Sequence, residues 1–536
     1  MTAATPRQTE PSAVRDALRS RREIALVDVR EEDPYAQSHP LFAVQLSASR
    51  LELDAPWRLP RRTVPVVVYD NGEGLALPAA QKLLALGWTD VSLLAGGLDG
   101  WVASGGEVFR DVNVPSKSFG ELVEHERDTP SLAAEEVKAL QEAGADIVVL
   151  DVRRYDEYRT MSIPGGTSVP GAELVLRARD LAPNPATRIV VNCAGRTRSL
   201  IGAQSLVNAG LPNPVSALRN GTIGWLLAGF ELDHGQQRRF GEVSEASRQA
   251  ARADAQRLAE RAGALRLDEA GLARWAADTQ RTLYRWDVRT PEEFEAGHRP
   301  GFGSAPGGQL LQETDVFAAV RGARIVLADG GPGSDGVRAP ITAHWLAQLG
   351  WEVAWLDSPP PAVLETGPWR PAGLPLPEVD SIGAEDLATL LAGDTVTLLN
   401  VAPSAVHVKG HIPGAWWALR SQLSAALTGL PKPPQRIVVT CGSGALARLV
   451  AADLRATTDV PVAVLDGGNT AWAAQGRPLE TGEARLLSPR IDRYRRPYEG
   501  TDAPREAMQA YLDWEFGLVA QLARDGTHNF QVLAAD

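Results

Sequence analysis

Two kinds of short apolar run alternate along the chain, and each kind occurs four times. Runs of the first kind end in Asp or Asn before a polar stretch: ALVDVREEDPY (25–35), VVLDVRRYDEY (148–158), YRWDVRTPEEF (284–294) and TLLNVAPSAVH (397–407). Runs of the second kind lead into polar or Gly-rich loops: PVVVYDNGEG (65–74), RIVVNCAGRT (188–197), RIVLADGGPG (324–333) and RIVVTCGSGA (436–445). Runs of this length and composition predict strands that are buried on both faces.

The spacing between the two kinds of run is nearly constant. The residue that ends the first run and the residue that opens the loop are 42 positions apart in three repeats (Asp28 to Asp70, Asp151 to Cys193, Asp287 to Asp329) and 41 apart in the fourth (Asn400 to Cys441). A turn that ends in Trp closes three of the repeats: GGLDGW (96–101), NGTIGW (220–225) and GGNTAW (467–472). A register kept over most of the chain indicates a fourfold internal repeat.

Helical spacing accompanies the strands within each repeat. The segments SLAAEEVKALQEAGA (131–145) and SLIGAQSLVNAG (199–210) are typical of helices that end at glycine, and the second is expected to begin near Ser199 or Leu200. Alternating strands and helices predict an α/β fold of four tandem domains, each a mainly parallel sheet with helices on both faces. The expected domains are 1–112, 120–235, 265–372 and 378–482, with a charged linker helix at 236–263 and a helical tail at 483–536. The amphipathic part of the tail, 504–526, is expected to pack on a neighbouring domain or a second subunit.

Composition narrows the class of protein. Of the 536 residues, 44% are apolar and 22% charged, and the net charge of -12 argues against nucleic acid as a partner. No apolar run approaches the roughly 20 residues that cross a membrane, and the N-terminus lacks the apolar centre of a secretory signal. We therefore expect a cytoplasmic protein with no membrane partner and with both cysteines reduced. The Cys and His positions lack metal-ligand spacing, so the sequence predicts no metal and no cofactor, and it does not predict the oligomeric state.

One cysteine stands where a predicted strand meets a predicted helix. Cys193 is followed by the candidate binding residues Ala194, Gly195, Arg196, Thr197, Arg198 and Ser199. The backbone N–H groups of such a tight loop and the N-terminus of the helix form a cup for an anion. The two arginines add positive charge, although the sequence does not distinguish which of them contacts the anion. A thiol in this cup is expected to have a depressed pKa and to attack an atom that the anion carries.

Two kinds of anion chemistry compete for this loop. A cysteine-based phosphatase closes a wider cup with an arginine six residues after the cysteine, whereas the sixth residue after Cys193 is Ser199 and the fifth is Arg198. The shorter loop favours a smaller group on the cysteine, such as a single transferred sulfur atom.

The motifs taken together resemble the rhodanese family of sulfurtransferases over nearly the whole chain. They are the DVR strand with its following EEF or EY, the GH-x-PG turn, the strand–Cys–loop–helix unit and the closing turn with Trp. The resemblance implies that Cys193 takes the outer sulfur of thiosulfate, releases sulfite and holds a persulfide that the amides of 194–199 stabilise. A thiol, cyanide or a protein cysteine would then accept the sulfur. Asp151 and Arg153 match the DVR motif, and we expect them to form an internal ion pair that supports the loop.

The other three repeats depart from this pattern. In repeat four CGSGALA resembles the loop of mercaptopyruvate-type sulfurtransferases, but Asn400 and Ala402 replace the Asp and Arg of DVR, so activity at Cys441 stays open. Asp70 and Asp329 occupy the cysteine position in repeats one and three and predict inactive repeats, because a carboxylate cannot carry the sulfur. The histidines of the corresponding turns, His39, His298 and His411, are expected to bind loop backbone rather than metal.

A non-catalytic protein is the alternative from another class. Four rhodanese-like folds would then form a scaffold on which Cys193 senses oxidants or persulfides.

Overall fold

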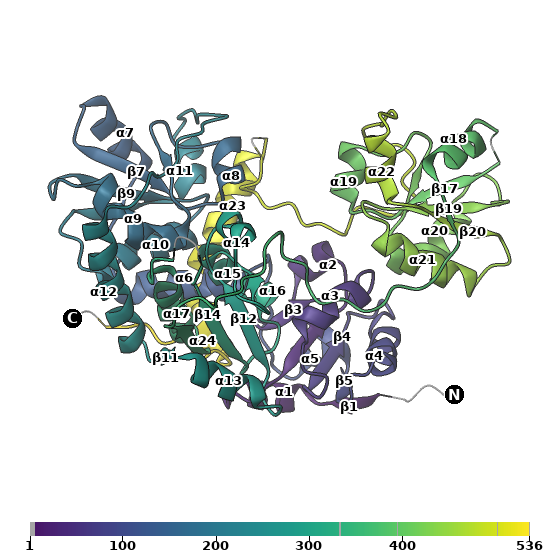
Figure 1. Ribbon diagram of the computed structural model, residues 1–536, viewed down its shortest axis with the longest axis horizontal. Helices are drawn as coiled ribbons and strands as arrows, with labels where there is room; N and C mark the ends of the chain where they lie inside the picture. Colours follow the sequence, from purple (N-terminus) through teal and green to yellow (C-terminus); the bar gives the residue numbers. More distant parts are fainter. Residues whose placement is uncertain (1–5, 332–333, 394, 501, 535–536) are drawn as a thin grey trace.

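Four five-stranded sheets form the computed structural model, which describes residues 6–331, 334–393, 395–500 and 502–534. Neighbouring strands in each sheet pair in parallel, and the four strand orders are equivalent: β1-β5-β4-β2-β3, β6-β10-β9-β7-β8, β11-β15-β14-β12-β13 and β16-β20-β19-β17-β18. Helices cover the sheets, as Figure 1 shows. The predicted fold class of four tandem α/β units is confirmed. Within the described residues no helix is both long and apolar enough to cross a membrane.

Repeat one is followed by a buried helix that the sequence analysis does not predict. The elements of the repeat are β1 (Arg7–Thr9), α1 (Pro11–Arg19), β2 (Ala25–Asp28), α2 (Glu32–Gln37), β3 (Ala43–Gln45), α3 (Leu51–Arg58), β4 (Val66–Tyr69), α4 (Ala76–Ala85), β5 (Val91–Leu94) and α5 (Gly97–Ala103). The additional helix, α6 (Val114–Arg127), begins with eight residues of which all are buried, including Lys117 and Glu121. The polar composition of α6 gives no sign of this burial, because its buried polar side chains pair with residues outside the helix.

Repeat two has the same order of elements. They are β6 (Ser131–Leu132), α7 (Ala134–Glu142), β7 (Ile147–Asp151), α8 (Tyr155–Thr160), β8 (Thr167–Ser168), the 3-10 turn η1 (Gly171–Glu173), α9 (Leu174–Leu181), β9 (Arg188–Asn192), α10 (Thr197–Asn208), β10 (Val215–Leu218) and α11 (Gly221–Leu227). Helix α10 begins at Thr197, two residues before the expected start, so the loop after Cys193 is shorter than the sequence suggested. Within the expected linker lies α12 (Glu245–Arg261), whose N-cap Ser244 accepts a hydrogen bond from the N–H of Ser247.

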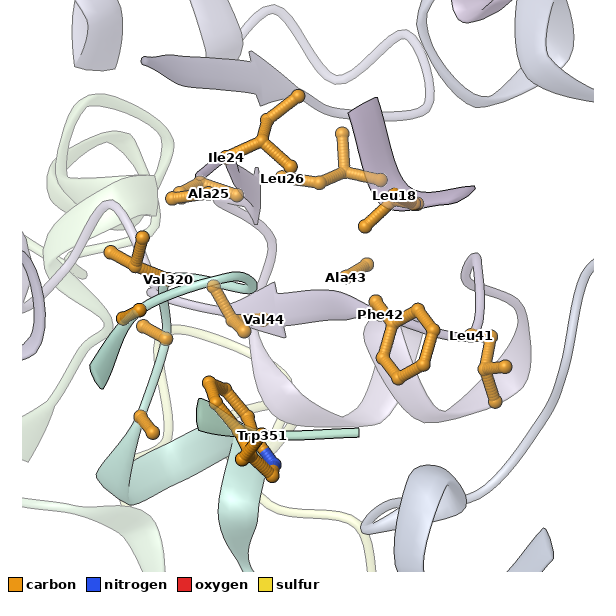
Figure 2. Packing of buried hydrophobic residues seen from close by; sticks show 14 of the residues in the cluster. Leu18, Ile24, Ala25, Leu26, Leu41, Phe42, Ala43, Val44, Val320 and Trp351 are labelled. Carbon is orange, nitrogen blue, oxygen red and sulfur yellow. The ribbon is translucent and has the colours of Figure 1, made fainter. Parts of the chain in front are cut away.

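Repeat three packs tightly against repeat one. Its elements are β11 (Leu265–Leu267), α13 (Glu269–Ala277), β12 (Leu283–Asp287), α14 (Pro291–Ala296), β13 (Gly303–Ser304), α15 (Gly307–Gln312), α16 (Thr314–Phe317), β14 (Arg324–Ala328), α17 (Arg338–Gln348) and β15 (Glu352–Leu356). Val320 and Trp351 of repeat three belong to the same buried cluster as Ile24, Phe42 and Val44 of repeat one (Figure 2). Burial of this shared apolar surface holds the two repeats together.

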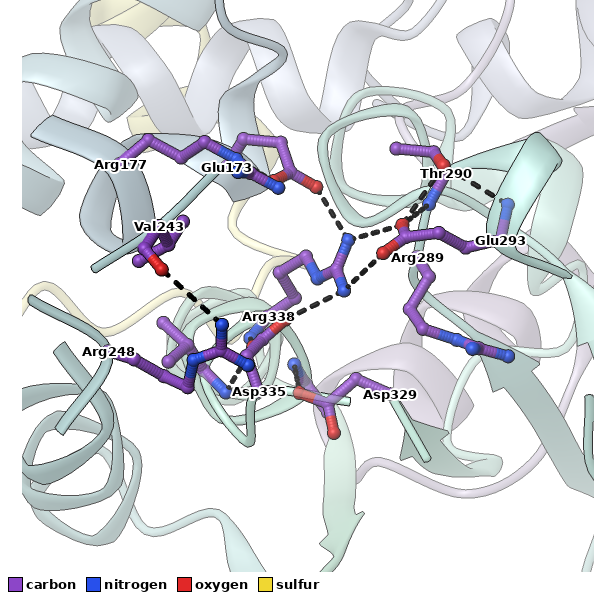
Figure 3. A network of polar contacts seen from close by, with 12 residues as sticks. Glu173, Arg177, Val243, Arg248, Arg289, Thr290, Glu293, Asp329, Asp335 and Arg338 are labelled. Carbon is purple, nitrogen blue, oxygen red and sulfur yellow. Dashed lines mark hydrogen bonds and ion pairs between the residues drawn. The ribbon is translucent and has the colours of Figure 1, made fainter. Parts of the chain in front are cut away.

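A buried arginine joins repeat three to repeat two. The guanidinium of Arg338 lies 2.8 Å from Glu173 of η1, 2.6 Å from Glu293 of α14 and 2.7 Å from Asp335 of its own loop (Figure 3). Of these three carboxylates, Glu173 belongs to repeat two, so its ion pair with Arg338 crosses the interface between the two repeats.

Repeat four stands apart from the other three in Figure 1. Its elements are β16 (Ser381–Ile382), α18 (Ala384–Ala392), β17 (Thr397–Asn400), α19 (Ser404–Lys409), β18 (Trp416–Trp417), η2 (Arg420–Gln422), α20 (Leu423–Thr428), β19 (Ile437–Thr440), α21 (Ala445–Arg455), β20 (Val462–Leu465) and α22 (Gly468–Ala474). It contacts repeat one through Arg420, whose guanidinium lies 2.7 Å from Glu52 of α3.

The C-terminal tail returns from repeat four to repeats one and two. It forms α23 (Arg505–Phe516) and α24 (Leu518–Asp525), which contact α6 and each other, and α23 also contacts α11. Met508, Tyr511 and Leu512 of α23 pack on Ile223 of α11. Of the two expected positions for the amphipathic tail, the structure therefore shows packing within the same chain.

Candidate active site

Cys193 lies at the carboxyl end of β9, in a closed loop. Its side chain is buried, with 2% of the residue exposed. The Cys193 Sγ–H donates to Ser199 Oγ at 3.3 Å, and Ser199 Oγ–H donates to the carbonyl of Arg196 at 2.8 Å. Two carbonyls of the loop point to α11, where the N–H of Thr222 donates to Cys193 O and the N–H of Ile223 donates to Ala194 O, both at 3.0 Å. These two hydrogen bonds anchor the start of the loop on the closing turn of the repeat.

The glycine-containing turn that closes repeats one, two and four lies in close backbone contact with the loop of its own repeat. A Cβ added to Gly221 would lie 2.3 Å from the Cys193 carbonyl oxygen. Gly97 and Gly468 approach the carbonyl oxygens of Asp70 and Cys441 in the same way, at 2.8 and 2.3 Å. All three glycines also have positive φ, which disfavours any other residue. The turn that ends in Trp, found at 96–101, 220–225 and 467–472, thus positions the loop of its repeat.

We expect Gly221→Ala to open the Cys193 loop. The added methyl meets backbone at a positive φ of 53°, and together these effects cost roughly 2–4 kcal/mol of local stability. Hydrogen exchange of a peptide covering 191–201 should accelerate at least ~30-fold. Gly210→Ala is the matched control, because φ is 72° there but nothing lies within 4 Å of the new methyl. Equal protection of the loop in both variants would contradict the role of the close contact.

Both arginines of the loop are engaged by carboxylates. Arg196 Nε donates to Glu121 at 2.8 Å, and its Nη2 also contacts Glu124. Arg198 forms a two-pronged pair with Glu157 of α8, at 2.9 and 3.0 Å. Arg198 holds the pKa of Glu157 down to about 2, against the opposing effect of burial. Each guanidinium is therefore held in an ion pair with a carboxylate, and the contact of either arginine with an anion stays a prediction.

The predicted depression of the Cys193 pKa is wrong. Burial raises the pKa of the thiol above its usual value, although Arg198 and hydrogen bonding with Ser199 act in the opposite direction. The sequence shows the charges of the loop but does not show how completely later segments exclude water from it.

Asp151 and Arg153 form a buried ion pair beneath the loop. Arg153 donates from Nε to Asp151 Oδ1 at 2.9 Å and from Nη2 to Oδ2 at 2.7 Å. Arg153 also donates to the carbonyl of Met161 at 2.6 Å, and Asn192, next to Cys193, donates to Asp151 at 2.9 Å. The expected pairing is present, while its importance for the loop stays a prediction.

The corresponding loops of repeats one and four differ from the Cys193 loop in their hydrogen bonds. In repeat one the Asp70 carboxylate accepts the N–H groups of Leu75 and Ala76 at 2.5 and 2.9 Å, so the acid itself fills the donors of its loop. In repeat four the N–H of Gly444 donates to Cys441 Sγ at 3.2 Å. Cys441 is buried like Cys193, but its loop carries the exposed Ser443.

The histidines of the turns contact backbone. The Nδ1 atoms of His39, His298 and His411 lie 2.8 Å from the carbonyl oxygens of Pro40, Phe294 and His407. No group of three or more metal-ligating side chains suited to an ion occurs in the described part of the chain.

Six residues that the sequence analysis missed close the site. One small cavity is lined by Cys193 and residues 194–198 together with Ser116 and Lys117 of α6, Gln312 of α15, Tyr498, and Tyr511 and Glu515 of α23. The amphipathic pattern of 504–526 was the one local signal of this packing, and it gave no indication of the surface that α23 covers.

The parallel five-stranded sheets, with the Cys193 loop after the central strand of its sheet, define the class of protein. A rhodanese-like domain model matches residues 10–104, 133–228 and 383–475, and the chain belongs to the rhodanese family. The solved structure of a thiosulfate sulfurtransferase from Pseudomonas aeruginosa is 61% identical, covers 98% of this chain and 100% of its own, and superimposes with a TM-score of 0.97. The chain is accordingly an enzyme of the sulfurtransferase class.

A further solved structure resembles only a small part of this chain. A rhodanese-related protein from Thermoplasma volcanium is 22% identical over 19% of this chain and 97% of its own, with a TM-score of 0.17. No curated protein sequence matches the chain.

Proposed function

We propose that Cys193 transfers the outer sulfur of thiosulfate to a thiophilic acceptor. The Cys193 thiolate attacks that sulfur, the S–S bond of thiosulfate breaks, and its electron pair leaves with sulfite. The thiol proton passes to solvent when the thiolate forms, so the products are sulfite and an anionic persulfide on Cys193. A thiol, cyanide or a protein cysteine then attacks the outer sulfur, and the electron pair of the broken bond returns to Cys193 as a thiolate.

The observation that supports this proposal is the position of the Cys193 sulfur in a loop whose first two carbonyl groups accept hydrogen bonds from α11. Donors of the loop are free to face a persulfide because Thr222 and Ile223 engage the carbonyls of Cys193 and Ala194. We assign the binding role to Ala194, Gly195, Arg196, Thr197, Arg198 and Ser199, and the supporting role to Asp151 and Arg153. In the related Pseudomonas protein the activity is in its name, thiosulfate sulfurtransferase.

An arginine-lined cavity offers the donor a path to this loop. The cavity has about 350 Å³ and is lined by Arg153, Arg154, Arg493 and Arg496, among others. It shares Gln312 and Tyr498 with the smaller cavity around Cys193, which has about 20 Å³ and space for about one water molecule. Thiosulfate therefore has to displace side chains at this junction when it binds.

Cys441 is a second candidate site. Its loop is neutral and carries the exposed Ser443, which suits a singly charged donor of the mercaptopyruvate type better than a dianion. We propose no activity for repeats one and three, and the cytoplasmic location stays a prediction. A scaffold or persulfide sensor without turnover is the alternative that the following measurement excludes.

We expect brief treatment with thiosulfate to add one sulfur atom to the wild-type protein at Cys193. Intact-protein mass gives the number of sulfur atoms, and sulfite release measured in parallel gives the stoichiometry of the first half-reaction. Cyanide added afterwards should remove the sulfur as thiocyanate. A protein that gains no sulfur and releases no sulfite contradicts thiosulfate as the donor and favours the scaffold.

A further inference from the structure

The C-terminal helix lies directly against the Cys193 loop. A Cβ added to Gly195 would lie 3.2 Å from Tyr511 Cε1 and 3.3 Å from Glu515 Oε2. Both side chains come from α23, more than 300 positions further along the chain. Any larger residue at position 195 would press on them, so the glycine allows the helix to approach the loop closely.

Glu515 has an oxygen without a partner in this contact. The residue is 1% exposed, and its Oε1 accepts a hydrogen bond from the Tyr511 hydroxyl at 2.8 Å. Its other oxygen, Oε2, is buried and has no hydrogen-bond partner among the described residues. An unsatisfied buried polar atom costs roughly 1–3 kcal/mol of stability. Such an atom beside Cys193 therefore indicates a position where a ligand supplies the missing hydrogen bond.

The groups that face Glu515 carry both signs of charge, and the cations among them are already paired. They are Tyr511 on its own helix, Lys117 and Glu121 on α6, Cys193 and Arg196 in the loop, and Tyr498 in the preceding segment. Lys117 lies 2.6 Å from Asp111, and Arg196 lies 2.8 Å from Glu121.

Among the described residues that face Glu515, no unpaired cation is thus left to neutralise its ionised form. Burial and the charge of Glu121 raise the pKa of Glu515 to about 8, although Lys117, Tyr511 and Arg196 favour ionisation. The side chain is mainly a neutral acid at pH 7, and a neutral acid can donate a hydrogen bond.

We propose that Glu515 binds the donor by donating a hydrogen bond from its protonated carboxyl group to a sulfonate oxygen of thiosulfate at Cys193. This inference rests on the proposed thiosulfate activity of Cys193. A sulfonate oxygen of the donor gives Glu515 Oε2 the hydrogen-bond partner that it lacks. Because the protonated carboxyl group is neutral, it does not repel the thiosulfate dianion. Ionisation of Glu515 removes the donated hydrogen and places a negative charge beside the sulfonate, so the site loses the donor.

The test is the pH dependence of KM for thiosulfate. If only the protonated form binds, KM of the wild type should rise about tenfold between pH 7 and pH 9. Glu515→Gln keeps an N–H donor at every pH and should show a KM that stays constant over this range. Glu506→Gln, on the exposed face of the same helix, is the matched control and should follow the wild type. An equal rise of KM in Glu515→Gln and in the wild type overturns the proposal.

A second variant, Tyr511→Phe, keeps the proposal testable if Glu515→Gln fails to fold. The hydrogen bond from Tyr511 lowers the pKa of Glu515, so Tyr511→Phe should move the rise of KM to higher pH. An unmoved rise in Tyr511→Phe counts against Glu515 as the titrating group. A wild type that gains no sulfur from thiosulfate overturns the proposed function together with this inference, whereas a wild type that gains sulfur with a constant KM overturns the role of Glu515 alone.

Discussion

Cys193→Ser should lower the steady-state rate of sulfite release from thiosulfate by at least ~10³-fold. The serine hydroxyl preserves the size of the side chain and the hydrogen bond to Ser199, but it ionises far outside the working pH range and cannot hold a sulfane sulfur. The sulfur of Cys193 is buried in the loop, so no other described thiol can reach the same donors. The measurement is sulfite production with cyanide as the acceptor.

Cys441→Ser separates the two candidate sites. Mapping the added sulfur to peptides should place it on the Cys193 peptide in this variant, with the same stoichiometry at that position as in the wild type. Sulfur that is retained in Cys193→Ser and lost only in the double variant would show that repeat four also takes thiosulfate. Loss of the sulfur in Cys441→Ser alone would refute Cys193 as the principal site.

The distance along the chain explains which features of the site could be predicted. The repeats, the strand–loop–helix unit and the Asp151–Arg153 pair depend on residues at most 42 positions apart, and a regular spacing reveals them. The raised pKa of Cys193 and the cover formed by Tyr511 and Glu515 depend on a tail about 320 positions away. No periodicity connects such segments, since their contact is decided by packing of the whole chain.

The paired arginines illustrate the same limit at shorter range. Arg198 and its partner Glu157 belong to the same repeat, yet nothing in the sequence indicated that the EY of the repeat would neutralise the loop. Arg196 turns instead to Glu121 on the unpredicted helix α6. In the proposed function, backbone N–H groups and the protonated Glu515 therefore act together with the paired arginines in binding the anion.

The repeats without a cysteine keep the scaffold of the loop. Repeats one and three retain the buried pairs Asp28–Arg30 and Asp287–Arg289, each with a contact of 2.6 Å. Repeat four lacks the ion pair, and there Asn400 accepts the N–H of Ala402 at 3.0 Å while its amide lies 2.9 Å from His407 Nδ1. The same turn is therefore built once with neutral groups and three times with ions.

This natural replacement allows the buried pair of repeat two to be tested by a double-mutant cycle. Arg153→Ala leaves the Asp151 carboxylate buried without its cation and should lower the opening free energy of repeat two by roughly 3–5 kcal/mol. Asp151→Asn combined with Arg153→Ala reproduces the residues of repeat four and leaves no buried charge. The double variant should therefore recover about 2 kcal/mol of that loss, and Asp151→Asn alone completes the cycle from which the coupling of the two residues is obtained.

Hydrogen exchange of the slowest amides of β7 and β9 measures these opening free energies within the intact chain. Arg154→Ala is the control, because Arg154 is the adjacent arginine, its side chain is exposed and its contact with Asp156 at 3.3 Å is a surface pair. Such a pair should change the opening free energy by at most about 1 kcal/mol. If the double variant is as unstable as Arg153→Ala, the loss comes from packing of the arginine stem and not from the unpaired carboxylate, and the ion pair is then replaceable only where His407 supplies a neutral partner.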